Sequence, residues 1–167
     1  MGATNGIALF VPEYDIKASE VLPHSGVFCF MPMIEIYFDG SCEPTNPDGN
    51  MGIGCLAKYK GENIEVFAQH IPRDRFRKTT TNNVAEYLGF LKALEFCRKH
   101  TDKECFIMGD SKFVVNQMNG RWKINDGKPY SPYARQAAQE LLELNNVKKI
   151  RWIPREMNFE ADGLSKM

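Results

Sequence analysis

The chain has 167 residues, of which 43% are hydrophobic and 25% are charged. A chain of this length can bury a core as one domain, and these proportions exclude wholesale disorder. No apolar run approaches the roughly 18 residues of a transmembrane helix, so no membrane partner is expected. The 21 Lys and Arg residues balance 21 Asp and Glu residues, so a polyanionic partner must be held by local groups or through metal ions.

The cysteines favour a reducing compartment. There are five of them, without a C-x-x-C pair, which fits neither a secreted disulfide framework nor a zinc site. No cationic leader followed by an apolar stretch opens the chain, so no secretory signal is expected. We therefore expect a cytoplasmic protein.

Residues 1–33 differ in composition from the rest of the chain. They hold three of the nine prolines and only four charged side chains, with short apolar stretches at residues 7–11 and 27–30 that lack a sustained period. We predict an N-terminal appendage of unknown role over residues 1–33 and a functional domain over residues 34–167. This segment fits a tail, an added strand or hairpin, or an over-long reading frame whose true start lies later.

Three strands are predicted to open the domain. Apolar and polar residues alternate from Ile34 to the carboxylate of Asp39, which is the pattern of a half-buried strand. Two further strands are expected near residues 52–59 and 63–71, separated by a short turn that contains Gly61. Such a turn predicts an antiparallel hairpin, so the three strands form a meander.

Helices and strands alternate after the meander. The polar stretch at residues 79–83 offers N-cap oxygens for a long helix that runs to about His100. The remaining expected elements are a strand at 105–108, a helix at 111–118, a helix from Pro132 to about 145, a strand at 147–153 and a short helix after Pro154. Because two strands are reached through helical crossovers, we predict an α/β fold whose mixed sheet has its last two strands parallel to the first.

Four carboxylates fall near the expected ends of these elements. Asp39 and Asp110 each close a strand, Glu86 lies in the first turn of the long helix, and Asp162 opens the terminal helix. A single carboxylate at such a position is more often a helix cap or a dipole partner than a ligand. Four of them at converging strand ends repel one another unless a cation neutralises them. Hard oxygen ligands of this kind predict Mg²⁺, with Mn²⁺ as a substitute.

Five sequence segments carry a resemblance to a known family. They read IYFDGSC at residues 36–42, NPDGNMGIG at 46–54, TNNVAE at 81–86, GDS at 109–111 and WIPREMNFEAD at 152–162. Their order and spacing across residues 34–167 resemble type 1 ribonuclease H. The resemblance implies a ribonuclease H-like fold with a five-stranded mixed sheet of order 3-2-1-4-5 flanked by helices. Its chain order is three strands, a helix, a strand, two helices, a strand and a helix.

The same resemblance implies an endoribonuclease that cuts the RNA strand of RNA–DNA hybrids and leaves a 3′-hydroxyl and a 5′-phosphate. It implies a site for two Mg²⁺ ions held by the four carboxylates. Asp39 would bridge both ions, and Glu86 and Asp110 would hold the ion that activates water. Asp162 would help to hold the ion on the leaving-group side. The hybrid is the expected partner, and no obligate protein partner is evident.

Substrate contacts are also implied by the resemblance. Four side chains would contact the hybrid across its minor groove, namely Cys42, Asn46, Asn82 and Asn83. Thr81 would help to form a pocket for a phosphate of the DNA strand, and Trp122, with Phe113 as a weaker candidate, would line the channel for that strand. Asn and Thr are also common as turn and cap residues, and Phe113 fits core packing equally well.

Three departures from the family pattern stand out. Residues 120–131 leave no room for a basic protrusion, and only Arg121, Lys123 and Lys128 remain there. The basic residues Arg73, Arg75, Arg77 and Lys78 either compensate or form a solvated loop. The loop before Asp162 lacks a histidine and offers Arg155 and Glu156 as accessory residues. Residues 1–33 do not resemble a separate hybrid-binding domain.

Two other functions compete with the nuclease. A catalytically silent nucleic-acid-binding domain of the same fold would be free to lose its carboxylates, and this chain keeps all four. A related nuclease of the superfamily, such as a junction resolvase or an exonuclease, would act on another substrate. The segments at residues 39–42 and 81–83 favour the ribonuclease.

Overall fold

The computed structural model describes residues 33–73 and 80–167. In chain order the elements are β1 (Ile34–Glu43), β2 (Asn50–Tyr59), β3 (Glu62–Ile71), α1 (Asn82–Lys99), β4 (Cys105–Gly109), α2 (Lys112–Met118), α3 (Ser131–Leu142), β5 (Val147–Trp152), the 3₁₀ turn η2 (Arg155–Met157) and α4 (Phe159–Leu164). The strands form one sheet of order β3-β2-β1-β4-β5. The predicted fold class and strand order are therefore confirmed.

Strand β1 is the centre of this sheet because it pairs on both sides. It runs antiparallel to β2, with Phe38 opposite Cys55, and parallel to β4, with Phe38 opposite Gly109. Its alternating residues Ile34, Ile36 and Phe38 are fully buried. The ring of Phe38 meets that of Phe90 on α1 edge to face, with centroids 5.3 Å apart. The main core thus lies between the sheet and α1.

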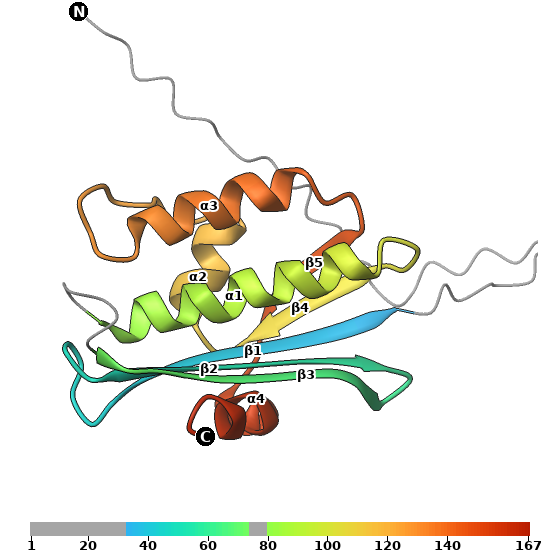
Figure 1. Ribbon diagram of the computed structural model, residues 1–167. Coiled ribbons are helices and arrows are strands. Elements are labelled where there is room, and N and C mark those ends of the chain that lie inside the picture. The colour runs from blue at the N-terminus through green and yellow to red at the C-terminus, as the bar shows by residue number, and fades with distance from the viewer. Residues whose placement is uncertain (1–32, 74–79) are drawn as a thin grey trace, which may run out of the picture.

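The two faces of the sheet are covered unequally (Figure 1). Helices α1, α2 and α3 lie on one side, and the short helix α4 crosses the other side against β1 and β2. Two glycines of β2 permit this crossing. A Cβ at Gly52 would overlap the carbonyl of Ser165, and one at Gly54 would overlap the carbonyl of Ala161.

Several predicted boundaries were wrong. Strand β1 continues to Glu43, so Asp39 lies inside the strand rather than at its end. Glu86 is the fifth residue of α1 and lies in its second turn, not its first. Helix α3 ends at Leu142, and the crossover to β5 is correspondingly longer than predicted. No helix within residues 33–73 and 80–167 is long and apolar enough to cross a membrane.

Candidate active site

Three elements bring three of the predicted carboxylates together. The parallel pairing of β1 with β4 places Asp39 beside Asp110, which follows Gly109 directly. Helix α1 can approach β1 at this level because Gly40 has no Cβ, and a methyl group there would overlap the backbone of Ala85 and Glu86. One carboxylate oxygen from each of Asp39, Glu86 and Asp110 lies within 4.8 Å of the other two. Such an acidic cluster can hold a metal ion.

Burial and mutual repulsion make this cluster electrostatically strained without a cation. Burial raises the pKa of Asp39 to about 7, and the nearby Asp110 and Asp162 add to that rise while a hydrogen bond from Ser165 opposes it. Burial, together with Asp39 and Asp110, raises the pKa of Glu86 well above its ordinary value. Among residues 33–73 and 80–167, the buried Oε2 of Glu86 has no hydrogen-bond partner. An oxygen-liganded divalent cation fits this donor set.

Two residues that the sequence analysis missed orient the carboxylates. The buried Asn158 donates from Nδ2 to the carbonyl oxygen of Phe38 at 2.9 Å and to Oδ1 of Asp110 at 2.8 Å. The hydroxyl of Ser165 lies 2.5 Å from Oδ2 of Asp39 and 2.9 Å from the carbonyl oxygen of Asp162. Asn158 and Ser165 stand four residues before and three after Asp162. Helical spacing around Asp162 is the signal that could have found them.

Asp162 lies beside the cluster rather than within it. Its carboxylate accepts hydrogen bonds from Arg155 and from Nζ of Lys166, the latter at 2.6 Å. Burial acts to raise the pKa of Asp162, but Lys166 and Arg155 outweigh it and leave that pKa below its ordinary value. Arg155 is therefore paired with Asp162, and its accessory role stays a prediction. Glu156 instead lines a separate groove beside α4.

The predicted minor-groove residues gather where the β1–β2 loop meets the start of α1. Oδ1 of Asn46 accepts a hydrogen bond of 3.0 Å from the backbone N–H of Asn82. Thr81 caps α1 by accepting from the N–H of Val84 at 3.2 Å, and Asn83 is exposed. Cys42 is buried, and its thiol donates to the carbonyl of Thr45. Some of these side chains therefore have a structural role as well, because they cap α1 or hold the β1–β2 loop.

Trp122 lies at the exposed end of an aromatic cluster. Its ring centroid is 6.4 Å from that of Phe113, which packs edge to face on Tyr130 at 4.8 Å. Gln117 fixes the loop, because its Oε1 accepts from the hydroxyl of Tyr87 at 2.5 Å and its Nε2 donates to the carbonyl of Lys123 at 2.7 Å. Phe113 is part of this packing, while Trp122 is 49% exposed.

Most of the basic loop before α1 lies outside the described residues. Of the four side chains predicted to compensate for the missing protrusion, only Arg73 is described, and its N–H donates to Oδ1 of Asn50 at 3.0 Å. Arg75, Arg77 and Lys78 belong to the segment 74–79. Residues 1–32 also fall outside the described part of the chain.

Comparisons with known proteins agree with this geometry. A family model described as "Reverse transcriptase-like" matches residues 37–167. The Ribonuclease H of Acetivibrio thermocellus is 31% identical over 130 residues, covering 74% of this chain and 81% of that protein. The Bifunctional protein Rv2228c of Mycobacterium tuberculosis is 39% identical over 85 residues, and the match spans only 23% of its length.

A solved structure shows that the similarity extends from the sequence to the fold. LC11-RNase H1, isolated from compost by a metagenomic approach, has been solved in complex with an RNA/DNA hybrid. That structure has a TM-score of 0.68 and 31% sequence identity, covering 80% of this chain and 94% of the LC11 chain. With the matching sheet order and the clustered carboxylates, these findings show that the chain belongs to the type 1 ribonuclease H family.

Proposed function

We propose that the protein is an endoribonuclease that hydrolyses the RNA strand of RNA–DNA hybrids and leaves a 3′-hydroxyl and a 5′-phosphate. The observation that carries the proposal is the cluster of Asp39, Glu86 and Asp110 in a chain of this family. A binding domain without activity would gain stability by replacing these buried, mutually repelling carboxylates with amides. Their retention supports catalysis.

We infer that the acidic cluster holds two Mg²⁺ ions, with Mn²⁺ as a substitute. Asp39, Glu86 and Asp110 would hold the ions together with Asp162. The Oε2 of Glu86, which no other described residue binds, supports its role as a ligand. Bound ions of this kind activate water and neutralise the charge that develops on a phosphodiester undergoing hydrolysis.

The chain's own side chains prepare the site for such a reaction. Asn158 holds Asp110 through Oδ1, and Ser165 holds Asp39 through Oδ2, so the two central carboxylates are oriented before substrate binds. Arg155 is exposed and pairs with Asp162, which positions a permanent positive charge for a backbone phosphate. Because arginine does not release its proton, Arg155 binds phosphate and does not shuttle protons.

Substrate recognition is proposed for two separate surfaces. The first lies at the start of α1 and carries Asn46, Asn82 and Asn83, whose amide groups suit 2′-hydroxyls and base edges in a minor groove. Thr81 belongs to this surface and would lie beside a DNA-strand phosphate. Cys42 is assigned to the same hybrid contact, although its side chain is buried. The second surface is the exposed face of Trp122, which suits apolar contact with deoxyribose.

The organisation and location of the protein complete the proposal. We assign the nuclease to residues 34–167 and regard residues 1–33 as an appendage. A reducing, cytoplasmic location fits Cys42, Cys55, Cys97 and Cys105, which are buried free thiols.

A substrate panel tests the proposed activity. RNA–DNA hybrid, double-stranded RNA and double-stranded DNA of one sequence are incubated with the protein in Mg²⁺, in Mn²⁺ and in EDTA. Cleavage confined to the RNA strand of the hybrid, dependent on the cation and leaving 5′-phosphates, is the expected result. Binding of the hybrid without cleavage would indicate the silent domain. Cleavage of a DNA duplex would indicate a different nuclease of the superfamily.

A further inference from the structure

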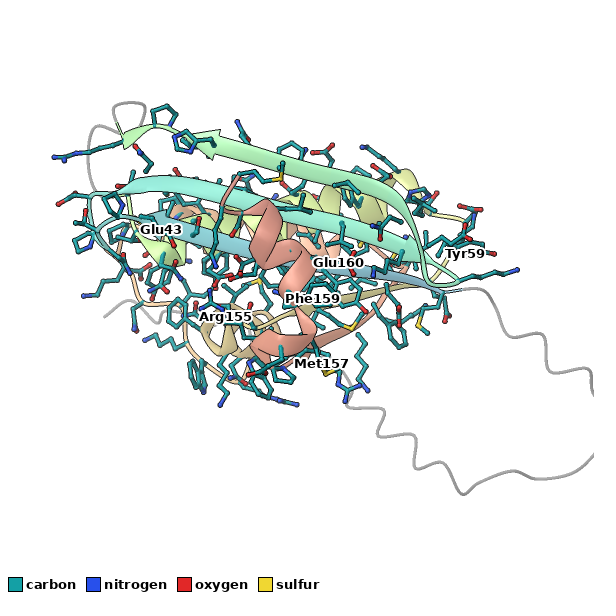
Figure 2. The ribbon with its side chains drawn as sticks, turned by 90° about the horizontal axis from the view of Figure 1, so that it is seen from below. Glu43, Tyr59, Arg155, Met157, Phe159 and Glu160 are labelled. Atoms are coloured by element: carbon teal, nitrogen blue, oxygen red, sulfur yellow. The ribbon has the colours of Figure 1, made fainter. Side chains whose placement is uncertain are left out.

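An apolar groove lies on the face of the sheet that α4 crosses. It has a volume of about 330 Å³, and its apolar lining includes Tyr37, Leu56, Met157 and Phe159. Met157 is 61% exposed and Phe159 is 67% exposed. Figure 2, seen from this side, shows Met157 and Phe159 where η2 leads into α4, on the face of the sheet that α4 crosses. Two large apolar side chains are therefore left on a single surface without cover from the described residues.

The apolar surface continues onto β3. Val66 pairs with Leu56 and is 56% exposed. Its neighbours Glu65 and Phe67 face α1, since Glu65 binds Nζ of Lys99 at 2.8 Å and Phe67 packs under Lys92. Alternation along the strand then places Val66 on the opposite face, the face of the groove. We call Tyr37, Leu56, Val66, Met157 and Phe159 the apolar strip.

Two of the three charged groups that line the groove are already paired, and the third, Glu156, is acidic. Lys58 and Glu160 form an ion pair, and Nδ2 of Asn63 donates to the second oxygen of Glu160 at 3.3 Å. The hydroxyl of Tyr37 lies 3.5 Å from a carboxylate oxygen of Glu35. Since these charges satisfy one another, the strip favours an uncharged, apolar occupant over a nucleic-acid phosphate or a charged peptide.

The chain itself carries such an occupant shortly before β1 in the sequence. Residues 27–30 read Val-Phe-Cys-Phe, contain no charge, and precede Ile34 by four to seven positions. At about 3.3 Å per residue they can reach roughly 13–23 Å from the start of β1. Tyr37 lies three residues into β1, about 10 Å from that start. The tether also gives the segment an effective concentration of about millimolar at the groove.

We propose that residues 27–30 fold back and dock on the apolar strip, so that Phe28 and Phe30 cover Met157 and Phe159. The linking residues 31–33 contain Pro32, which suits the reversal of direction that this requires. The docking surface is intramolecular. It is separate from the acidic cluster and does not depend on the proposed nuclease activity.

Methionine oxidation of the full-length chain by hydrogen peroxide tests the docking. Met157 is compared by mass spectrometry with Met167, which is 75% exposed at the other end of α4 and serves as the internal reference. If the groove is occupied about four-fifths of the time, Met157 reacts about fivefold more slowly than Met167. The full-length variant Phe28→Asp with Phe30→Asp should bring the two rates to within about twofold. The matched control, Leu9→Asp with Phe10→Asp, adds the same charges elsewhere in the appendage and should leave Met157 protected.

Three results would overturn the proposal. Met157 could react as fast as Met167 in the unaltered protein, or its protection could survive Phe28→Asp with Phe30→Asp. Protection that grows with protein concentration would assign the strip to a second copy of the chain. Thermal melts of all variants check that each remains folded.

Disulfide trapping gives a second readout. In full-length Val66→Cys, mild oxidation with diamide should link the new thiol to the native Cys29 within one chain, with reduction of diamide to the hydrazine. The control is Leu142→Cys, a position 62% exposed at the end of α3 on the helical side of the molecule. Faster intramolecular linking at position 66 supports docking, and equal rates at the two positions contradict it.

Discussion

Replacing Asp39 with asparagine should stabilise the metal-free protein, and the gain should depend on pH. Asp39 is buried, and burial is the main reason that its pKa rises from 3.8 to about 7 in the folded protein. A carboxylate whose pKa is higher in the folded than in the unfolded state favours folding most below its unfolded value. That stabilisation is lost as pH rises from about 4 through 7.

The size of the effect follows from this pKa. A rise from 3.8 to about 7 corresponds to about 4 kcal/mol, at about 1.4 kcal/mol for each tenfold change in proton affinity. Asparagine keeps the shape of the side chain, and its amide oxygen can still accept the proton of Ser165. Burial of the amide offsets part of the gain. Asp39→Asn should therefore raise the free energy of unfolding by about 2–4 kcal/mol at pH 8.5 and by less than about 1 kcal/mol at pH 4.

Urea unfolding in EDTA at several pH values measures this difference. Asp162→Asn is the contrasting variant, because Lys166 and Arg155 hold the pKa of Asp162 below its ordinary value against the effect of burial. Its ionised form stabilises the fold above the unfolded pKa, so its loss should destabilise the protein at pH 8.5. A gain for Asp39→Asn that is the same at every pH, or no gain at pH 8.5, would refute the assigned electrostatics.

Four further variants test other parts of the structure. Asn158→Ala should lower kcat for hybrid cleavage about tenfold or more with little change in KM, because Asp110 loses its orienting hydrogen bond. Steady-state kinetics measures both constants, and a raised KM with an unchanged kcat would contradict this role. Gly52→Ala should lower the melting temperature because its methyl group meets the carbonyl of Ser165, whereas Gly163→Ala, with open space at its Cβ, should stabilise helix α4 by up to about 1 kcal/mol. Changing Arg73, Arg75, Arg77 and Lys78 together to serine should raise KM several-fold and make KM less dependent on salt concentration. An unchanged salt dependence of KM would assign hybrid binding to Arg121, Lys123 and Lys128 instead.

Local pattern was enough to predict the sheet and its neighbours. The alternation of Ile34, Ile36 and Phe38 located β1, and the crossover rule placed β4 parallel to it, which put Asp39 beside Asp110. The end of β1 was not predictable in this way. Its last residues, Gly40 to Glu43, break the alternation and are held in the strand by pairing with β2, where Glu43 lies opposite Asn50.

The support of the carboxylates depends on tertiary contacts that no local pattern contains. Asn158 reaches Phe38 across 120 positions and Ser165 reaches Asp39 across 126. From the sequence alone, an asparagine and a serine near a terminal helix fit helix caps as well as residues that orient a carboxylate. The apolar strip was hidden for a related reason, because Val66 and Phe67 make both faces of β3 partly apolar. Only packing by α1 decides which face is covered.

Cleavage by Asp110→Asn is the most direct test of the acidic site. A hybrid with a 5′-labelled RNA strand is incubated in Mg²⁺ with the unaltered protein and with this variant, and thermal melts are recorded for both. The amide preserves the shape of the side chain next to Asn158 but removes one charge from the three-carboxylate cluster. We expect cation-dependent cutting of the RNA by the unaltered protein, and only background cutting by a variant that melts no earlier. Unaltered turnover by folded Asp110→Asn would contradict it.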